Sequence, residues 1–147
     1  MNIVLLCVDG SVASIAATHV ALRVAHDSDA KVHALFVVEN SGLAARVDRA
    51  IDGHGSGRKL IDSGEAVLAR VAVLAEAAKV EFECAIETGE PFERILELAD
   101  RLDPEFIVMG RTGRRGPGRA LVGSEVEHVL EFAEQPVIVV PAARRRS

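Results

Sequence analysis

The sequence predicts an α/β protein with three layers, in which a parallel sheet lies between two layers of helices. Five short runs are rich in Val, Ile and Leu, and segments with helical periodicity separate them. The runs are apolar throughout rather than alternating, which is typical of parallel strands covered on both faces. Right-handed crossovers between successive strands then give the three layers. The five predicted strands are Ile3 to Val8, Lys31 to Val38, Val80 to Ile86, Phe106 to Met109 and Val137 to Val140.

Four segments between these strands have the apolar spacing of helices. Ser11 is suited to cap the first helix, which runs to roughly Asp27, and Pro91 is suited to the first turn of the third. The second helix covers the alanine-rich stretch from Arg58 to Lys79, and the fourth begins near Ser124. Their apolar faces are assigned to Ile15, Val20, Leu22, Val24, Leu60, Ile61, Val67, Leu68, Val71, Leu74, Ile95, Leu96, Leu98, Val126, Val129, Leu130 and Phe132.

Length and composition indicate one domain. The chain has 147 residues, of which 49% are hydrophobic, and this is typical of a single globular unit with a real core. We expect the domain to cover residues 1–143 and the basic residues 144–147 to form a solvated tail. A net charge of -5, with no Trp or Tyr and only five Phe, argues against nucleic-acid binding, which needs a basic face or aromatic platforms.

The N-terminal residues MNIVLLCVDGS predict neither a signal peptide nor a membrane span. No basic segment precedes the apolar run, and Asp9 interrupts the run too early. We therefore expect a cytoplasmic protein that does not contact a membrane. Cys7 and Cys84 have no partners at metal-ligand spacing, so both are interpreted as small buried hydrophobic residues in a reducing compartment.

Three connections are predicted to form the ligand site. Sheets of this kind bind ligands beyond the carboxyl ends of their strands, which selects the connections after Val8, Val38 and Met109. The connection from Glu39 to Gly57 is long and weakly patterned, and we interpret it as a mobile flap over the site. The connection after the fourth strand, MGRTGRRGPGRALVGSE, holds five glycines and four arginines. Glycines allow the backbone to bend around a ligand, and arginines indicate that the ligand is anionic.

The glycine-rich connection matches neither of two common phosphate motifs. A P-loop requires Lys and then Ser or Thr after its second glycine, whereas Arg119 and Ala120 follow Gly118. The dinucleotide fingerprint G-x-G-x-x-G follows the first strand, where this chain reads VDGSVAS. Both interpretations are therefore rejected.

The same connection does contain Gly110-x-x-Gly113, nine further residues, and then Gly123-Ser124 at the start of a helix. Glycines at these positions allow backbone N–H groups and a helix N-terminus to approach a phosphate. Thr112 and Ser124 add hydroxyl donors. The remaining glycines, around Pro117, are interpreted as turn residues.

The pattern G-x2-G-x9-G-S/T after a strand ending in Val-Met resembles the nucleotide-loop motif of the universal stress protein family, in particular its ATP-binding branch. Four other segments are similar to that family: IVLLCVDGS, HALFVVE, ETGEPFERILELADRLDPEFIVMG and EFAEQPVIVVP. The resemblance covers the whole chain. It implies a Rossmann-like domain with a five-stranded parallel sheet in the strand order 3-2-1-4-5.

The resemblance also implies an adenine-nucleotide site. ATP, with or without Mg²⁺, is the expected ligand, and AMP and a cyclic nucleotide remain open. The ribose and adenine would lie near Cys7, Val8, Asp9, Val37 and Met109, and the phosphates over Gly110, Thr112, Gly113, Gly123 and Ser124, with Glu125 and Val126 lining the helix start. Additional donors would be Arg111, Arg114, Arg115 and Arg119. From the residues alone, Asp9 also suits a turn as a less favoured alternative, and Met109 equally suits the core.

Two residues depart from the family pattern, in which many members have an apolar residue and then Ser or Thr after Gly-Ser. Here Glu125 and Val126 occupy these places. Val126 has no hydroxyl for a phosphate. The Glu125 carboxylate suits a helix N-terminus, but within about 5 Å of a phosphate it would cost on the order of 1 kcal/mol unless Mg²⁺ bridges the two groups.

Three functions are consistent with these residues. The first is an adenine-nucleotide-binding module in stress response that senses or regulates, with at most slow hydrolysis, because no catalytic Lys or base-and-nucleophile pair is found. The second is a family member without nucleotide that acts as a dimeric protein-interaction module. The third is a small hydrolase that uses Asp9 and Ser124. The resemblance also implies a homodimer through the apolar strand Val137 to Val140, which would otherwise expose unpaired backbone groups at an edge.

Overall fold

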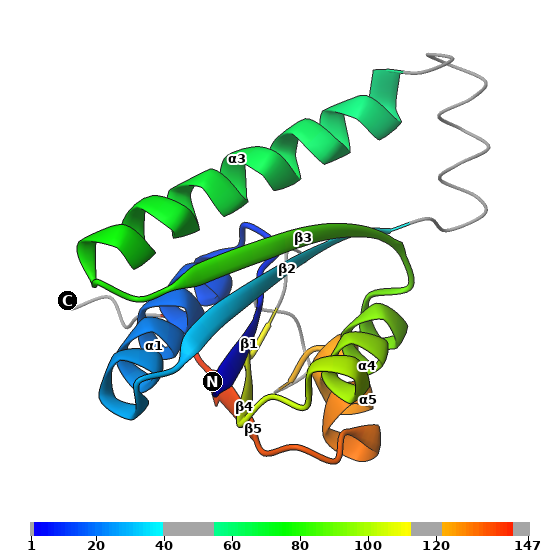
Figure 1. Cartoon of the computed structure of the whole chain (residues 1–147). Helices are drawn as coiled ribbons and strands as arrows, with labels where there is room; N and C mark the ends of the chain where they lie inside the picture. The colour runs from blue at the N-terminus through cyan, green and yellow to red at the C-terminus, as the bar shows by residue number, and fades with distance from the viewer. Residues whose placement is uncertain (1, 40–54, 113–121, 143–147) are drawn as a thin grey trace, which may run out of the picture.

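The computed structural model describes residues 2–39, 55–112 and 122–142 (Figure 1). In these residues five parallel strands alternate with four helices, and the sheet has the order β3-β2-β1-β4-β5. The predicted fold class and strand order are therefore confirmed. None of the helices in these ranges is both long and apolar enough to cross a membrane. The elements are β1 Ile3–Cys7, α1 Val12–Ser28, β2 Lys31–Glu39, α3 Gly55–Ala77, β3 Phe82–Gly89, α4 Pro91–Leu102, β4 Phe106–Gly110, α5 Ser124–Phe132 and β5 Val137–Val140.

The predicted boundaries lie within one residue of the observed ones except at two elements. The second helix covers Gly55–Ala77 rather than Arg58 to Lys79, and the third strand begins at Phe82 rather than Val80 and extends to Gly89. Val80 still belongs to the turn that ends α3, because its N–H donates to the carbonyl of Ala75 at 2.9 Å. Lys79 has a positive φ of 58°, a left-handed conformation that ends the helix. An apolar run alone does not separate such a helix end from the start of a strand.

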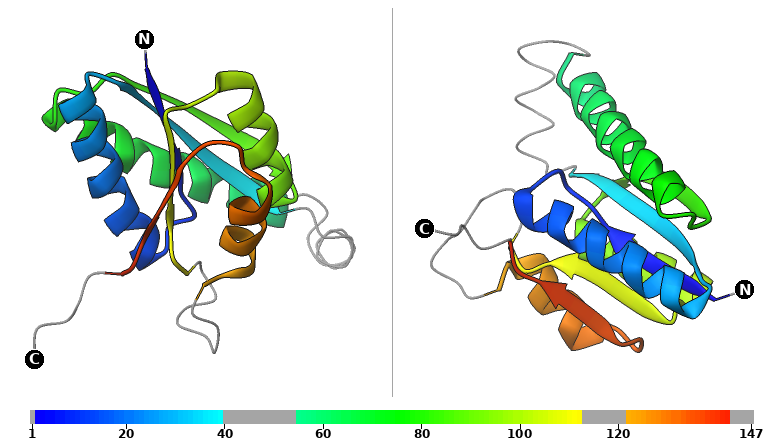
Figure 2. Two further views of the ribbon diagram at one scale, coloured as in Figure 1. Left: turned by 90° about the horizontal axis from the view of Figure 1, so that it is seen from below. Right: turned by 90° about the vertical axis from the view of Figure 1, so that its left-hand side faces the viewer.

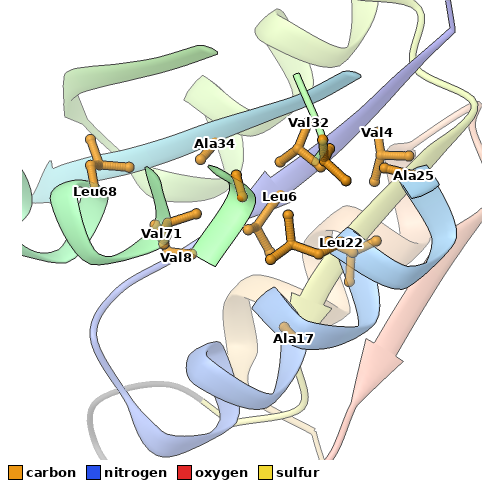
Figure 3. Packing of buried hydrophobic residues seen from close by; sticks show 14 of the residues in the cluster. Val4, Leu6, Val8, Ala17, Leu22, Ala25, Val32, Ala34, Leu68 and Val71 are labelled. Carbon is orange, nitrogen blue, oxygen red and sulfur yellow. The ribbon is translucent and has the colours of Figure 1, made fainter. Parts of the chain in front are cut away.

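Each face of the sheet buries its own apolar cluster. Figure 2 shows α1 and α3 on one side of the sheet and α4 and α5 on the other. In β1, Val4 and Leu6 face the first cluster and Leu5 the second, and all three are fully buried. Figure 3 shows the first cluster, where Leu22 of α1 and Val71 of α3 pack toward the sheet. Burial on both faces explains why this strand is apolar at successive positions.

Several apolar residues assigned from the sequence lie outside the core. Ile15, Ile61, Leu130 and Phe132 are exposed. In α1 the small side chains of Ala13, Ala17 and Ala21 face the sheet instead, because this helix packs very close to it. Cys84 is also exposed, contrary to the prediction, since it lies on β3 at an edge of the sheet.

Gly64→Ala is expected to destabilise the protein although alanine favours helices. A Cβ at position 64 of α3 would lie 2.7 Å from Cδ1 of Phe36, whose ring is buried in the first cluster. We expect this overlap to exceed the roughly 1 kcal/mol gained in helix propensity, for a net loss of about 1 kcal/mol in urea unfolding. Ser63→Ala, at an exposed position of the same helix, is the matched control and should be neutral or stabilising. A more stable Gly64→Ala variant would contradict this packing.

Candidate functional site

The segments predicted to bind a ligand meet at one edge of the sheet. β1, β2 and β4 are parallel neighbours, so their carboxyl ends lie at the same edge. Val37 lies near the end of β2, Gly110 is the last residue of β4, and Asp9 follows β1. The pairing extends past β1, because the N–H of Val8 donates to the carbonyl of Leu35 at 3.0 Å. The helices α1, α4 and α5 also begin at this edge, because each of them follows a parallel strand in the chain (Figure 1).

Asp9 forms the turn between β1 and α1. Its Oδ1 accepts a hydrogen bond from the N–H of Ser11 at 2.9 Å, and its own N–H donates to Oγ of Ser14 at 3.1 Å. Oγ of Ser11 accepts from the N–H of Ser14 at 3.1 Å, which confirms the predicted N-cap. Asp9 thus has the turn role that the sequence left open. The side chain of Ser11 caps the start of α1.

Gly110, the last residue of β4, packs directly against the first turn of α1. A Cβ added there would lie 2.8 Å from both the carbonyl carbon and Cβ of Ala13, and 3.0 Å from the backbone nitrogen of Ser14. The sequence suggested a phosphate-binding role for this glycine. The structure shows in addition a packing reason for it, which a single sequence does not reveal.

The two ends of the glycine-rich connection are joined beside β5. The N–H of Arg111 donates to the carbonyl of Val140 at 2.7 Å, and the N–H of Gly123 donates to the carbonyl of Arg111 at 2.9 Å. Thr112, half-buried, follows directly. These bonds place the start of α5 next to the end of β4. Four predicted site residues lie outside the described residues, namely Gly113, Arg114, Arg115 and Arg119. So do residues 40–54 of the flap predicted from Glu39 to Gly57. The ends of that segment belong instead to β2, which includes Glu39, and to α3, which begins at Gly55.

Among the described residues, no side chain caps the start of α5. Gly123 is the N-cap residue, with φ -67° and ψ 155°, and it has no side-chain oxygen that could accept from the first backbone N–H groups. Ser124 is exposed, and its carbonyl lies 2.7 Å from Nδ1 of His128. The first N–H groups of the helix are those of Ser124, Glu125 and Val126, all predicted site residues.

The side chain of Glu125 caps the start of the neighbouring helix α4 rather than the start of its own helix. Its Oε2 accepts from the N–H of Phe92, in the first turn of α4, at 2.8 Å. The rings of Phe92 and His128 stack with their centroids 4.4 Å apart, which joins the two helix starts. Among α1, α4 and α5, only α5 therefore begins without a side chain of a described residue on its backbone N–H groups.

Glu125 also belongs to a group of three carboxylates. One carboxylate oxygen from each of Glu39, Glu90 and Glu125 lies within 4.8 Å of the others. Burial is the largest cause that raises the pKa of Glu125, and the negative charges of Glu90 and Glu39 raise it further. The hydrogen bond from Phe92 acts in the opposite direction. The hydrogen bond from Phe92 thus holds the Glu125 carboxylate at the start of α4.

The side chains of the remaining predicted residues are buried or half-buried. Met109 and Val126 are 5% and 4% exposed and belong to the second apolar cluster, so Met109 has the core position that the sequence left open. Cys7 and Val37 are half-buried against the same cluster. Burial, with a smaller contribution from Asp9, raises the pKa of the Cys7 thiol to about 12, so this thiol is neutral at physiological pH.

Glu125→Gln is expected to stabilise the fold by about 0.5–1 kcal/mol at pH 7.5, because the amide oxygen still accepts from Phe92 while the repulsion from Glu90 and Glu39 disappears. The folded chain binds the Glu125 proton more readily than the unfolded chain, since the folded pKa is raised above the usual 4.5. The gain should therefore be absent below pH 4.5 and grow as the pH rises through the raised pKa. Urea unfolding at several pH values measures it.

The control for this prediction is Glu127→Gln, at an exposed position in the first turn of α5. It removes the same charge outside the three-carboxylate group and should show no comparable dependence on pH. If Glu125→Gln were less stable than the native chain at pH 7.5, the negative charge of Glu125 would be required at the start of α4 and the repulsion would be minor.

Comparison with known proteins agrees with this architecture. The model of the universal stress protein family matches residues 1–141. The chain belongs to this family. It is 33% identical over 141 residues to a universal stress protein of Methanocaldococcus jannaschii, an alignment that covers 93% of this chain and 80% of the relative.

Solved structures of the family have the same fold. The chain is similar to the universal stress protein UspA from Lactobacillus plantarum, with 28% identity, a TM-score of 0.71, and coverage of 95% of this chain and 97% of that one. A family protein from Arabidopsis thaliana, solved with AMP bound, has 22% identity and a TM-score of 0.69 over 97% of this chain and 93% of its own. At this lower identity the similarity shows the fold alone.

Proposed function

We propose that this universal stress protein is a cytoplasmic module that binds an adenine nucleotide, in the first place ATP with Mg²⁺, and that it senses or regulates rather than catalyses. The observation that carries the proposal is the start of α5. No side chain in the described part of the chain caps its backbone N–H groups, while Ser11 and Glu125 cap the starts of α1 and α4. Uncapped N–H groups and the helix dipole favour a phosphate at that position.

Three family structures support the choice of ligand. The Arabidopsis thaliana protein has AMP bound, one universal stress protein was solved with cAMP, and that from Archaeoglobus fulgidus was solved with dAMP. All three ligands combine adenine with a phosphate. In this chain the phosphates would lie over the N–H groups of Ser124, Glu125 and Val126, beside Thr112. The ribose and adenine would lie along Cys7 to Asp9 and at Val37.

Mg²⁺ would enter this site with the phosphates. The carboxylates of Glu39, Glu90 and Glu125 bring negative charge to the region where α5 begins, and carboxylate oxygens are ligands of the kind that Mg²⁺ takes. A divalent cation would reduce the repulsion between this group and a triphosphate. We therefore expect ATP with Mg²⁺ to bind more tightly than ATP in the presence of EDTA.

Titration calorimetry tests the proposal directly. We expect saturable binding of ATP with Mg²⁺ in the micromolar range, weaker binding with EDTA, and binding of GTP at least about tenfold weaker, a difference of 1.4 kcal/mol. AMP and cAMP are measured in parallel, and mass spectrometry of the natively purified protein identifies any retained nucleotide. Absence of binding by all adenine nucleotides at millimolar concentration would refute the proposal. Steady ATP turnover that is lost in Asp9→Ala would instead show an enzyme.

The second candidate, a dimeric interaction module, is favoured by the surface around β5. β5 is an edge strand, and Leu130 and Phe132 of the adjacent α5 are 50% and 59% exposed. An edge of this kind has backbone groups that another strand could pair. We propose a homodimer through Val137–Val140, with or without nucleotide. Analytical ultracentrifugation at micromolar concentration tests it, and a monomer there would contradict it.

A further inference from the structure

His33 is a largely buried histidine of β2 that has no part in the proposed nucleotide site. Leu35, two residues further along the strand, belongs to the second apolar cluster, so His33 also faces the layer of α4 and α5 (Figure 2). In the sheet it pairs with Leu5 of β1 on one side and with Glu83 of β3 on the other. Its side chain is only 13% exposed. A titratable group is therefore covered by β3 and α4.

Both ring nitrogens of His33 are shielded from solvent, and neither has a hydrogen-bond partner among the described residues. Oε2 of Glu83 lies 3.6 Å from Nδ1, which is beyond the distance of a hydrogen bond. The other oxygen of this carboxylate lies 3.0 Å from Nζ of Lys31, so a cation already engages it. A neutral imidazole in such a place loses its hydrogen bonds to water, and an imidazolium loses more.

Among the described residues, charged groups from three elements act on His33. Lys31 lies two residues earlier on β2, Glu83 lies on β3, and Arg101 lies in the last turn of α4. Burial is the largest cause and lowers the pKa of His33, the carboxylate of Glu83 raises it, and the positive charges of Lys31 and Arg101 lower it further. From β1 the apolar Leu5 lies opposite. A proton on His33 thus adds a third positive charge to a group that holds one carboxylate.

We propose that His33 is a pH-sensitive switch in the fold, which keeps β3 and the second half of α4 closed over it while it is neutral and opens them when it takes up a proton. An imidazolium needs partners for both of its N–H groups, and water supplies them once the cover is displaced. β3 is an edge strand, held by β2 on one side alone, and α4 packs on both of these strands. The proposal does not depend on the proposed nucleotide site, which lies at the other end of β2.

The direction of the pH dependence follows from the lowered pKa. In the opened chain His33 has its ordinary pKa of 6.5, and in the closed chain its pKa is below that value. Above pH 6.5 the imidazole is neutral in both forms, and the closed form is fully stable. As the pH falls through 6.5 toward the lowered pKa, the opened form binds the proton more readily and its population rises. The switch therefore operates in mildly acidic solution.

Hydrogen exchange of the whole chain, measured by mass spectrometry at about pH 7.5 and about pH 5.5, tests the proposal. The rates are first corrected for the intrinsic dependence of amide exchange on pH. We expect the opening equilibrium constant of peptides from β3 and from the second half of α4 to be about threefold or more higher at the lower pH. Peptides from the other elements should show a smaller increase, because their local openings leave His33 covered.

A variant and a matched control assign the effect to His33. His33→Gln keeps a polar side chain that does not titrate, so the difference between the two pH values should disappear. The two rates are compared within one variant, so the result holds whatever the substitution costs in stability. His19→Gln makes the same change at an exposed position of α1 and should retain the full difference.

NMR titration of the His33 ring gives an independent measurement. The ring in the folded chain should titrate at lower pH than the histidine of a short unstructured peptide with the sequence KVHAL. Glu83→Gln should lower the titration further, because it removes the carboxylate that favours the protonated ring, and Arg101→Gln should raise it. Opposite shifts in these two variants would show that the groups around His33 set its titration.

Three results would each overturn the proposal. The first is an unchanged pH dependence of exchange in His33→Gln. The second is titration of the His33 ring at or above the pH of the peptide, which would mean that Glu83 stabilises the imidazolium in the closed form. The third is an equal increase of exchange in every element at the lower pH, which would show general acid destabilisation of the domain rather than a switch at β3 and α4.

Discussion

Gly110→Ala is expected to lower the free energy of unfolding by about 2–3 kcal/mol and the melting temperature by roughly 5–10 °C. The added methyl group would lie 2.8 Å from the carbonyl carbon of Ala13 and 3.0 Å from the backbone nitrogen of Ser14. These are backbone atoms at the start of α1, so a rotamer change cannot relieve the contact. Either α1 or the end of β4 must move, and both are packed in the core.

A double-mutant cycle with Ala13→Gly tests the cause. The second substitution removes the Cβ that would lie 2.8 Å from the new methyl group, although the contact with the backbone of residue 13 remains. Ala13→Gly alone should cost about 1 kcal/mol, because glycine is unfavourable in a helix. The double variant should therefore be more stable than the sum of the two losses predicts. If the free energy of unfolding of Gly110→Ala were within about 0.5 kcal/mol of that of the native chain, α1 would not pack as closely on β4 as described.

This packing changes how nucleotide-binding variants can be interpreted. A substitution at Gly110 that abolishes binding could act on the phosphate or on the fold, since the residue holds α1 against β4. The turn that Asp9 forms is coupled to the same contact, because Ser14 accepts its N–H. Variants that report on the ligand alone must therefore lie at the other end of the glycine-rich connection.

The sheet could be predicted from the sequence because its signal is strong and local. β1 and β4 are short apolar runs buried on both faces, and the connections between strands have lengths that suit right-handed crossovers. The order of the strands required the resemblance to a family, since the apolar runs do not state which strands are neighbours. The start of α1 was also predictable, because Ser11 caps its own helix within three residues.

The contacts that organise the site were not predictable in the same way. Glu125 and Phe92 are 33 residues apart in the chain, and only the packing of α5 against α4 brings them together. The charge of Glu125 therefore looked unfavourable from the sequence, where its partner was unknown. The tight fit at Gly110 is likewise a property of two elements that are distant in sequence. The sequence alone therefore does not distinguish a glycine that is required for packing from one that is required for phosphate binding.

Gly123→Asp is expected to weaken nucleotide binding strongly while leaving the fold intact. Gly123 has φ -67° and ψ 155°, an extended conformation that aspartate adopts without strain. Its N–H bond to Arg111 does not involve a side chain and should persist. The new carboxylate would accept from the first N–H groups of α5 and occupy the position proposed for a phosphate, with a full negative charge. We expect ATP affinity to fall by about thirtyfold or more, roughly 2 kcal/mol.

Gly123→Asp should preserve or slightly raise the melting temperature while it lowers the ATP affinity, so a loss of binding could not be attributed to unfolding. Aspartate is as good an N-cap residue as serine, so the melting temperature of Gly123→Asp should be equal to or slightly above that of the native chain. Gly123→Asn caps the helix without the charge and should lose less affinity than the aspartate variant, while Gly123→Ala, which adds no acceptor, should lose least. This order would show that the uncapped N–H groups themselves bind the phosphate. If Gly123→Asp bound ATP as tightly as the native chain, any phosphate site would have to lie elsewhere, and the start of α5 would be uncapped for a reason unrelated to nucleotides.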